Sequence, residues 1–280
     1  MKHCNIIIMN YNEKGYLKNC IDSIKKNTSY SNYKIIVIDN NSGDGSKKLV
    51  KLKYPDVDLI KNPKNYGASK TLNIGIKYAI KKYNPDYFYL LNNDTLVKKN
   101  WLSEAIKTSE KYSLCGIVGS KQLTFERKPT ISAGWIKMFG VKYYYGDEEK
   151  EVSWVSGAGF LIKKEVISGI GLFDEIYNPA YYEETDFEKR AMLVGFKIIH
   201  CPKSIFLHKG GVTTSKINTN FDEIHYRNRI IYFLRYYSWF YFLPRIILDI
   251  IRGIKNRKLK EVFSGYKKGL KLKRGFVTTI

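Results

Sequence analysis

The first half of this chain of 280 residues alternates short β-branched runs with stretches of helical periodicity, and this alternation limits its possible folds more than any other feature. The runs have the length of buried strands, and the stretches between them place apolar side chains on one helical face. The predicted strands are 4–9, 34–38, 57–60, 87–91 and 114–119, and the predicted helices are 15–26, 46–53, 68–82 and 101–112. This pattern predicts βαβ units and a mostly parallel sheet that is sandwiched by helices.

The predicted strands end in amides and carboxylates. The carboxyl ends of parallel strands meet at one edge of a sheet, where ligands bind in open α/β folds. A single Asp after a strand is most often a helix N-cap, but four polar ends in succession favour a binding cleft. These ends are Asn10-Tyr11-Asn12, Asp39-Asn40-Asn41, residues 62–65 and Asn92-Asn93-Asp94.

The second half is less regular. Residues 120–150 are interpreted as an exposed connection or hairpin, and order returns at 152–163. Residues 183–193 are predicted to form a helix with an acidic start, followed by strands at 196–200 and 205–208.

The charge balance indicates an anionic partner. The chain has 48 Lys and Arg against 26 Asp and Glu, a net charge of +22, and residues 216–280 contribute 15 basic and four acidic residues. Nucleic acid, an anionic membrane surface and phosphorylated substrates all remain compatible with this excess. The four cysteines are far apart and contain no CxxC pair, which argues against a disulfide framework or zinc site and fits a reducing cytoplasm.

Several common catalytic motifs are absent from the sequence. It has no GxxxxGK[ST] phosphate loop, no GxGxxG after the first strand, no HExxH and no GxSxG. A P-loop enzyme, a Rossmann dehydrogenase and a serine hydrolase of the GxSxG type are therefore disfavoured.

Carboxylates, amides and one histidine remain as candidates for chemistry. Asp94 follows a predicted strand, where it could hold Mg²⁺ or Mn²⁺ together with substrate phosphates, or could cap the next turn. Glu183, Glu184 and Asp186 form a cluster that could supply a general base, or could simply favour a helix N-terminus. His208 is either a metal ligand or a histidine at the end of a strand.

An ordered series of eight segments resembles the inverting GT-A-fold glycosyltransferases of family 2, particularly their rhamnosyltransferase-like members, which build bacterial surface glycans. The resemblance covers residues 5–211. The segments are IIIMNYN (6–12), VIDNNSGDGS (37–46), NYGASKTLNIGIKYA (65–79), YLLNNDT (89–95), WVSGAGFLIKKEV (154–166), GLFDE (171–175), YYEETDFEKRAMLVGF (181–196) and HKGG (208–211).

The resemblance implies an α/β fold of the GT-A type over residues 1–215 and a role for each matching residue. Asp94 and His208 would hold Mg²⁺ or Mn²⁺, and Glu184 would be the catalytic base, with Glu183 and Asp186 as further candidates. The residues expected to line the site of a UDP-, dTDP- or GDP-sugar are Asn10, Tyr11, Asn12, Asp39, Asn41, Asn65, Gly67, Asn73, Asn92, Asn93, Trp154, Gly157 and Ala158.

The sequence departs from the family pattern at two of these positions. Asn92 stands where the first Asp of the DxD-type metal motif would be, so metal dependence is an expectation that rests on Asp94. Glu184 replaces the catalytic Asp of an ED pair, so a side chain longer by one methylene carries the same chemistry. Glu183 is therefore also a candidate for the catalytic base.

The C-terminal region 216–280 is predicted to be a basic, aromatic helical appendage. Rings mixed with Lys and Arg suit a helix that lies in a membrane interface, which would place the protein at the inner face of the cell membrane with a glycan or lipid-linked acceptor. The alternative is an ordinary helical appendage that packs its aromatic rings on the catalytic domain. No stretch of the sequence approaches the length of a membrane span.

Three rival functions were weighed against glycosyl transfer. Nucleic-acid binding is permitted by charge and aromatic content, but it lacks a recognised motif and is opposed by the acidic cluster at 183–188. A catalytically idle GT-A subunit remains an alternative because Asn92 stands where the first acid of the metal motif would be. Nucleotidyl transfer is weakened because the first strand ends in Asn-Tyr-Asn rather than in a glycine-rich loop. The sequence indicates no oligomeric state.

Overall fold

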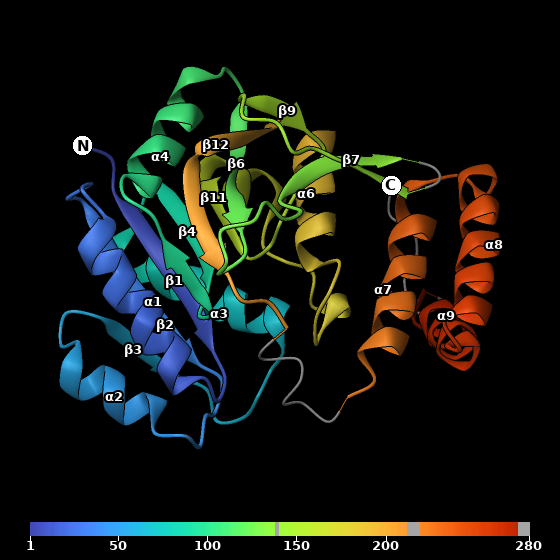
Figure 1. Cartoon of the computed structure of the whole chain (residues 1–280), viewed down its shortest axis with the longest axis horizontal. Coiled ribbons are helices and arrows are strands. Elements are labelled where there is room, and N and C mark those ends of the chain that lie inside the picture. The colour runs from blue at the N-terminus through green and yellow to red at the C-terminus, as the bar shows by residue number, and fades with distance from the viewer. Residues whose placement is uncertain (138–139, 212–218, 274–280) are drawn as a thin grey trace.

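The predicted alternation of strands and helices is present in the computed structural model, which describes residues 1–137, 140–211 and 219–273 (Figure 1). Its elements follow the expected segments closely through the first half of the chain. They are β1 (Cys4–Asn10), α1 (Lys14–Asn27), β2 (Tyr33–Asp39), α2 (Ser46–Lys53), β3 (Asp58–Lys61), α3 (Ala68–Tyr83), β4 (Tyr87–Asn92), β5 (Thr95–Val97), α4 (Trp101–Lys111) and β6 (Cys115–Leu123).

The second half contains more strands than the sequence predicted. The two apolar runs at 196–200 and 205–208 belong to one long strand, β12, and the expected hairpin is formed by β7 and β8. The elements are β7 (Ala133–Lys137), β8 (Gly140–Tyr143), β9 (Lys150–Val152), β10 (Trp154–Val155), β11 (Gly159–Lys163), α5 (Lys164–Ile170), the short 3-10 helix η1 (Glu175–Tyr177), α6 (Glu183–Leu193), β12 (Lys197–His208), α7 (Phe221–Tyr236), α8 (Trp239–Lys255) and α9 (Leu259–Lys273).

Within the described residues, the central sheet has nine strands in the order β3-β2-β1-β4-β11-β6-β12-β5, with β9 also paired to β12. The four strands β3, β2, β1 and β4 are mutually parallel. Strand β11 runs antiparallel between β4 and β6, while β6 and β12 are parallel. The reversed strand β11 therefore brings its amino end to the edge where β4 and β6 have their carboxyl ends.

Strand alternation divides the core into two layers, one on each face of the sheet. In β1, Ile6 and Ile8 point into the layer formed with α1 and α4, and Ile7 points into the layer formed with α3, α5 and α6. The parallel strands are buried on both faces, which explains why they read as continuous apolar runs.

The C-terminal helices α7, α8 and α9 form a third core and lie together at one side of the molecule, next to α6 (Figure 1). This core contains Ile230, Phe233 and Val262, and it also includes Tyr177 of η1. The expected boundary between residues 215 and 216 falls outside the described residues. No helix in the described parts of the chain is both long and apolar enough to span a membrane.

Candidate active site

Buried amides join the carboxyl ends of β1, β2 and β4. Asn10 is fully buried, and its Nδ2 donates to Asp39 Oδ2 (3.1 Å) and to Ser42 Oγ (3.1 Å). Its Oδ1 accepts a hydrogen bond from Asn93 Nδ2 (2.8 Å). Three of the predicted residues therefore meet at the sheet edge, because consecutive strands place their ends side by side.

The loop after β2 is shaped by short polar side chains. Ser42 N donates to Asp39 Oδ1 (2.8 Å), and Gly43 N donates to Asn12 Oδ1 (2.7 Å). Asn12 and Asn41 both adopt left-handed backbone conformations, with φ of 54° and 69°, which Asn tolerates better than most residues. Asn41 is exposed, while Asn12 and the neighbouring Tyr11 are half-buried.

The predicted Asn65 and Gly67 form the adjoining wall. Asn65 Oδ1 accepts from Asn40 Nδ2 (2.7 Å) and from Gly67 N (2.9 Å). A Cβ at Gly67 would lie 2.7 Å from Pro179 Cα, and its φ of 76° is also unfavourable for other residues. Gly67 is therefore required by the close approach of the 178–179 segment.

Asn73 links helix α3 to the backbone of Phe173 in the described structure. Its Nδ2 donates to Phe173 O (2.9 Å), and its Oδ1 accepts from Phe173 N (3.0 Å). This buried amide fastens α3 to the segment before η1, and its contact with a nucleotide-sugar stays a prediction.

Asp94 and His208 lie next to each other, although 114 positions separate them in the sequence. Asp94 Oδ1 is 3.1 Å from His208 Nε2, and Asp94 Oδ2 accepts from Gly210 N (3.0 Å). Pairing of β5 with β12 sets Thr95 opposite His208 and so creates the contact. Asn92 Nδ2 also lies 3.4 Å from His208 Nε2.

These donors fit a divalent cation that is shared with a diphosphate. Mg²⁺ and Mn²⁺ are commonly held by one or two carboxylates, and phosphate oxygens complete their coordination. Within the described ranges no group of three or more His, Cys, Asp or Glu side chains could hold a metal by itself. Metal binding by Asp94 and His208 therefore stays a prediction.

Backbone contacts connect the Asp94 region to the glutamates of α6. Asn92 N donates to Ala158 O (2.9 Å) across the β4–β11 pair. Next to Ala158, a Cβ at Gly157 would lie 3.4 Å from Cδ of Glu184. Glu184 is therefore next to Gly157, and the following residue, Ala158, is hydrogen-bonded to Asn92 at the sheet edge that carries Asp94.

The two adjacent glutamates differ in their electrostatic surroundings. Burial, and then the charge of Glu184, raise the pKa of Glu183 well above its usual range, and Glu183 Oε2 has no hydrogen-bond partner among the described residues. Burial also raises the pKa of Glu184, but hydrogen bonds from the backbone of Glu184 itself and from the Trp154 side chain oppose that rise. The two adjacent carboxyls therefore titrate as a pair, with burial disfavouring the charged form of both.

Asp186 differs from the glutamates because basic side chains surround it. It is fully buried, with Arg190 Nε at 2.8 Å from Oδ2 and Arg235 Nη1 at 2.8 Å from Oδ1. Tyr236 and Tyr177 also donate their hydroxyls to Oδ1, at 2.7 Å and 3.1 Å. These contacts join α6 to α7 and leave Asp186 no free oxygen for a substrate.

The turn that leads into α6 is held by a buried amide of α7. Tyr181 and Tyr182 have φ of 72° and 71°, a left-handed conformation that is unfavourable for aromatic residues. Asn228 Nδ2 donates to the carbonyl oxygens of residues Tyr177, Ala180 and Tyr181 at 2.8–2.9 Å. The C-terminal region thus fixes the direction in which Glu183 and Glu184 leave the turn.

A family model described as "Glycosyl transferase family 2" matches residues 5–171, about three-fifths of the chain. The chain belongs to glycosyl transferase family 2. The match covers the sheet edge with Asp39 and Asp94 and also the Trp154–Ala158 segment.

Named relatives of this family 2 chain act in glycan synthesis. A hexosyltransferase of low-salt glycan biosynthesis, Agl10 from Haloferax volcanii, is 25% identical over 235 residues, which are 81% of this chain and 74% of the relative. An N-acetylglucosaminyl-diphospho-decaprenol L-rhamnosyltransferase from Mycobacterium tuberculosis is 20% identical over 84% of this chain and 85% of its own.

Solved structures confirm the GT-A fold. GalNAc-T7, solved with UDP, GalNAc and Mn²⁺, superposes with a TM-score of 0.66 at 17% identity over 83% of this chain, which spans about half (48%) of that protein. The mannosyltransferase PcManGT from Pyrobaculum calidifontis, solved with GDP-Man and Mn²⁺, superposes with a TM-score of 0.61 at 15% identity over 99% of this chain and 76% of its own.

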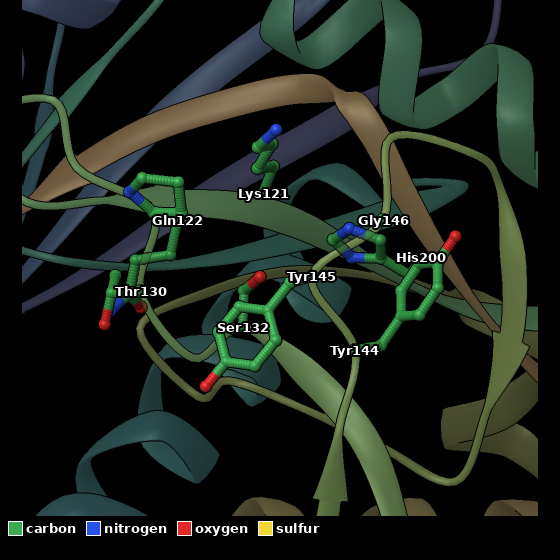
Figure 2. Close-up of a pocket in the computed structure, with 9 residues that line it drawn as sticks. Lys121, Gln122, Thr130, Ser132, Tyr144, Tyr145, Gly146 and His200 are labelled. Atoms are coloured by element: carbon green, nitrogen blue, oxygen red, sulfur yellow. The ribbon is translucent and has the colours of Figure 1, made fainter.

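A small pocket of this family 2 fold is lined by residues of β6, β12 and the segments on either side of the β7–β8 hairpin (Figure 2). Burial, and then the charge of Lys121, lower the pKa of His200 to about 4, so its ring is neutral at pH 7. Gln122 connects the pocket to the active-site segment, because its Oε1 accepts from Ser156 Oγ (3.0 Å). The lining residues are Lys121, Gln122, Pro129, Thr130, Ser132, Tyr144, Tyr145, Gly146 and His200, none of which the sequence had singled out.

Glu188 is a fully buried glutamate that the sequence had not singled out as a candidate, whereas Glu183 and Glu184 are half-buried. It lies one turn after Glu184, and its Oε1 accepts from Val155 N (3.1 Å) while Oε2 has no hydrogen-bond partner among the described residues. Burial, and then the charge of Glu184, raise the pKa of Glu188 well above its usual range. Its position four residues after Glu184 was the available signal, because this spacing places both carboxyls on one helical face.

Replacing Glu188 should make the family 2 transferase more stable at alkaline pH. A carboxyl whose pKa is raised by folding stabilises the fold below its unfolded pKa, and this contribution is lost as the pH rises through the folded pKa. Glu188→Gln should therefore increase the free energy of unfolding at pH 8 by about 1 kcal/mol or more, with a gain that shrinks toward pH 4.5. Urea unfolding at both pH values measures this difference.

The control is Glu165→Gln, at an exposed glutamate of α5, which should change stability by less than about 0.5 kcal/mol at either pH. A loss of stability in Glu188→Gln at pH 8 would show that its carboxylate is ionised and paired in the folded state.

Proposed function

We propose that this chain is an inverting glycosyltransferase that moves a sugar from a nucleotide-diphosphate donor to a glycan or lipid-linked acceptor in surface polysaccharide synthesis. The proposal is supported by the contact of Asp94 with His208 at the sheet edge that also holds Asp39, and by Glu184, which lies beside Gly157 in the segment that pairs with β4. These residues provide the polar groups needed for a nucleotide, a diphosphate and an attacking hydroxyl.

Donor binding would begin at the carboxyl ends of β1 and β2. Asp39 is held by Asn10 and Ser42, and the surrounding amides of Asn12, Asn65 and Asn93 offer donors and acceptors for a base and ribose. The relatives' structures with UDP and GDP-Man support a nucleotide-sugar donor of the UDP, dTDP or GDP class. The sugar would extend toward Trp154, Gly157 and Ala158.

The diphosphate would lie beside Asp94 and His208. When bound, Mg²⁺ or Mn²⁺ supplies neutralisation of the negative charge that develops on the departing diphosphate. Asn92 would add an amide oxygen or a donor at the place of the missing carboxylate. The Mn²⁺ in the structures of GalNAc-T7 and PcManGT supports this assignment.

Glu184 would act as the general base. The acceptor oxygen attacks the anomeric carbon while the bond from that carbon to the diphosphate oxygen breaks, and Glu184 takes the hydroxyl proton. Burial raises the pKa of both Glu183 and Glu184, and the charge of Glu184 raises that of Glu183 further, so the two carboxyls titrate as a pair and Glu183 remains the competing candidate for the base. Asp186 is a positioning residue, because its oxygens are taken by α7 and Arg190.

A lipid-linked acceptor is supported by the C-terminal region. The exposed face of α8 is apolar, with side chains that are 48–66% exposed, and basic residues such as Arg252 and Lys255 flank it. This combination matches the interface of an anionic membrane. The name of the mycobacterial relative, which contains a diphospho-decaprenol, supports the same acceptor class. The residues of the apolar face are Phe240, Leu243, Ile247, Ile251 and Ile254.

Glu184→Gln should reduce sugar transfer by about 10²-fold or more, because the amide cannot accept the hydroxyl proton. Binding of the nucleotide-sugar should survive. The experiment is a transfer assay with a panel of UDP-, dTDP- and GDP-sugars, coupled to calorimetric titration of the donor.

The matched control is Glu183→Gln, which should retain transfer within about tenfold of the wild type. Near-normal turnover by Glu184→Gln would remove Glu184 from this role. A wild-type protein that binds a donor but transfers no sugar to any acceptor would favour the catalytically idle subunit.

Asp94→Asn should abolish the effect of Mn²⁺ on donor binding. In the wild type, Mn²⁺ should tighten nucleotide-sugar binding, and the variant should bind the donor at least about tenfold more weakly in its presence. Asp147→Asn, at an exposed carboxylate, is the control. Equal Mn²⁺ effects in wild type and Asp94→Asn would contradict the assignment of Asp94 as a metal ligand.

Ile247→Glu combined with Ile251→Glu should weaken binding to phosphatidylglycerol vesicles by about tenfold or more, because both side chains lose apolar burial in the interface. Leu52→Glu, at an exposed leucine of α2, is the matched control and should bind normally. Vesicle flotation measures the bound fraction. Unchanged binding of the double variant would refute the role of α8.

A further inference from the structure

Arg245 of α8 is a buried cation without a full set of partners. Arg245 is only 5% exposed, and its Nε and Nη1 have no hydrogen-bond partner within the described structure. An arginine cannot become neutral by losing its proton in a protein. Burying an uncompensated charge is strongly unfavourable, so the guanidinium is expected to have a function.

The neighbours of Arg245 do not neutralise it. The ring of Phe233 lies 5.5 Å from its Cζ, and a Cβ at Gly140 would lie 3.8 Å from Nη1. Burial, and then the positive charge of Arg229, lower the pKa of Arg245. The nearby acid, Asp249, is already bound by Arg229 and by the Tyr266 hydroxyl. Two arginines thus share one carboxylate.

The small sheet β10-β7-β8 connects Arg245 to the proposed base. Strand β10 supplies Trp154, which hydrogen-bonds Glu184, and pairs with β7 at Gly134. Strand β8 supplies Gly140 beside Arg245 and pairs with β7 at Lys137. Gly134 and Lys137 are three positions apart, which is about 10 Å along the strand. The small sheet therefore links the neighbourhoods of Arg245 and Glu184.

The opposite face of α8 is the apolar face proposed to meet the membrane. Buried Arg245 and Asp249 are spaced by four residues on one side of the helix, and exposed Leu243, Ile247 and Ile251 are spaced by four residues on the other. One helix therefore has a buried side with Arg245 and Asp249 and an exposed apolar side with Leu243, Ile247 and Ile251.

We propose that Arg245 binds the phosphate or diphosphate group of a lipid-linked acceptor, with the lipid over the apolar face of α8 and the sugar directed toward Glu184. The inference rests on the proposed function, and it assigns an acceptor-phosphate site that is separate from the donor diphosphate at Asp94. A phosphate group matches the guanidinium in charge and hydrogen-bonding geometry.

The test compares Arg245→Met with Arg252→Gln, an equal change of charge at an exposed arginine of the same helix. Binding of the full chain is measured with phosphatidylcholine vesicles, with and without a polyprenyl diphosphate, with phosphatidylglycerol vesicles and with free inorganic pyrophosphate. Arg245→Met should lose about tenfold to 100-fold in affinity for the polyprenyl diphosphate and keep its affinity for phosphatidylglycerol. Arg252→Gln should keep its affinity for the polyprenyl diphosphate.

Thermal unfolding of the free protein separates a binding role from a structural one. If Arg245 has no compensating partner in the ligand-free protein, Arg245→Met removes an uncompensated buried charge. The melting temperature of the variant should then equal or exceed that of the wild type. A lower melting temperature with unchanged polyprenyl diphosphate affinity would overturn the proposal. So would binding of pyrophosphate that is as tight as binding of the lipid, because the site would then take a soluble anion.

Donor titration distinguishes this inference from the proposed function. Nucleotide-sugar binding with Mn²⁺ should be the same in wild type and Arg245→Met. If the protein transfers sugar to a soluble glycan but does not bind the polyprenyl diphosphate, the Arg245 site is refuted and the proposed function is not. Affinity for the lipid that depends on Arg245, in a protein that binds no nucleotide-sugar, would refute the proposed function and leave the phosphate site standing.

Discussion

The buried carboxylate of Asp186 is the interaction on which the active site depends. Arg190 of its own helix and Arg235 of α7 both pair with it, and the Tyr177 and Tyr236 hydroxyls complete its shell. A buried charge is tolerated only when it is paired and hydrogen-bonded, so α6 and α7 must remain in contact for the fold to be stable. Because α6 carries the proposed base, the C-terminal helices pack directly against the element on which the proposed activity depends.

The site itself combines two kinds of environment. At the ends of β1, β2 and β4, amide side chains form hydrogen bonds with one another. This edge is polar, and its charged side chains are Asp39 and Asp94. At the start of α6, by contrast, three glutamates are enclosed and their pKa values are raised by burial. A polar edge suits a ligand that arrives with its own charge, and enclosed carboxyls suit the handling of a proton.

The sequence allowed the polar strand ends to be predicted because the strands are short, apolar and parallel, and local patterns mark where each one stops. Asp94, Glu184 and His208 were predicted from the family resemblance, and their roles stay predictions; Asp94 and His208 are in contact, and Glu184 lies beside Gly157. Local patterns could not reveal the reversed direction of β11 or the three-residue strand β5, because both depend on pairing with distant strands. The same holds for Arg235 and Asn228, whose partners lie about 50 positions away.

The reversed strand β11 has a consequence for how the fold can change. The chain leaves the sheet at the carboxyl end of β6 and returns at the amino end of β11, which is the same rim, so residues 124–158 form an excursion that enters and exits on one side. Its length is independent of any crossover through the sheet. Apart from β9, which pairs with β12, this segment can be lengthened or shortened without changing the order of the central strands, whereas residues 4–92 form successive βαβ crossovers.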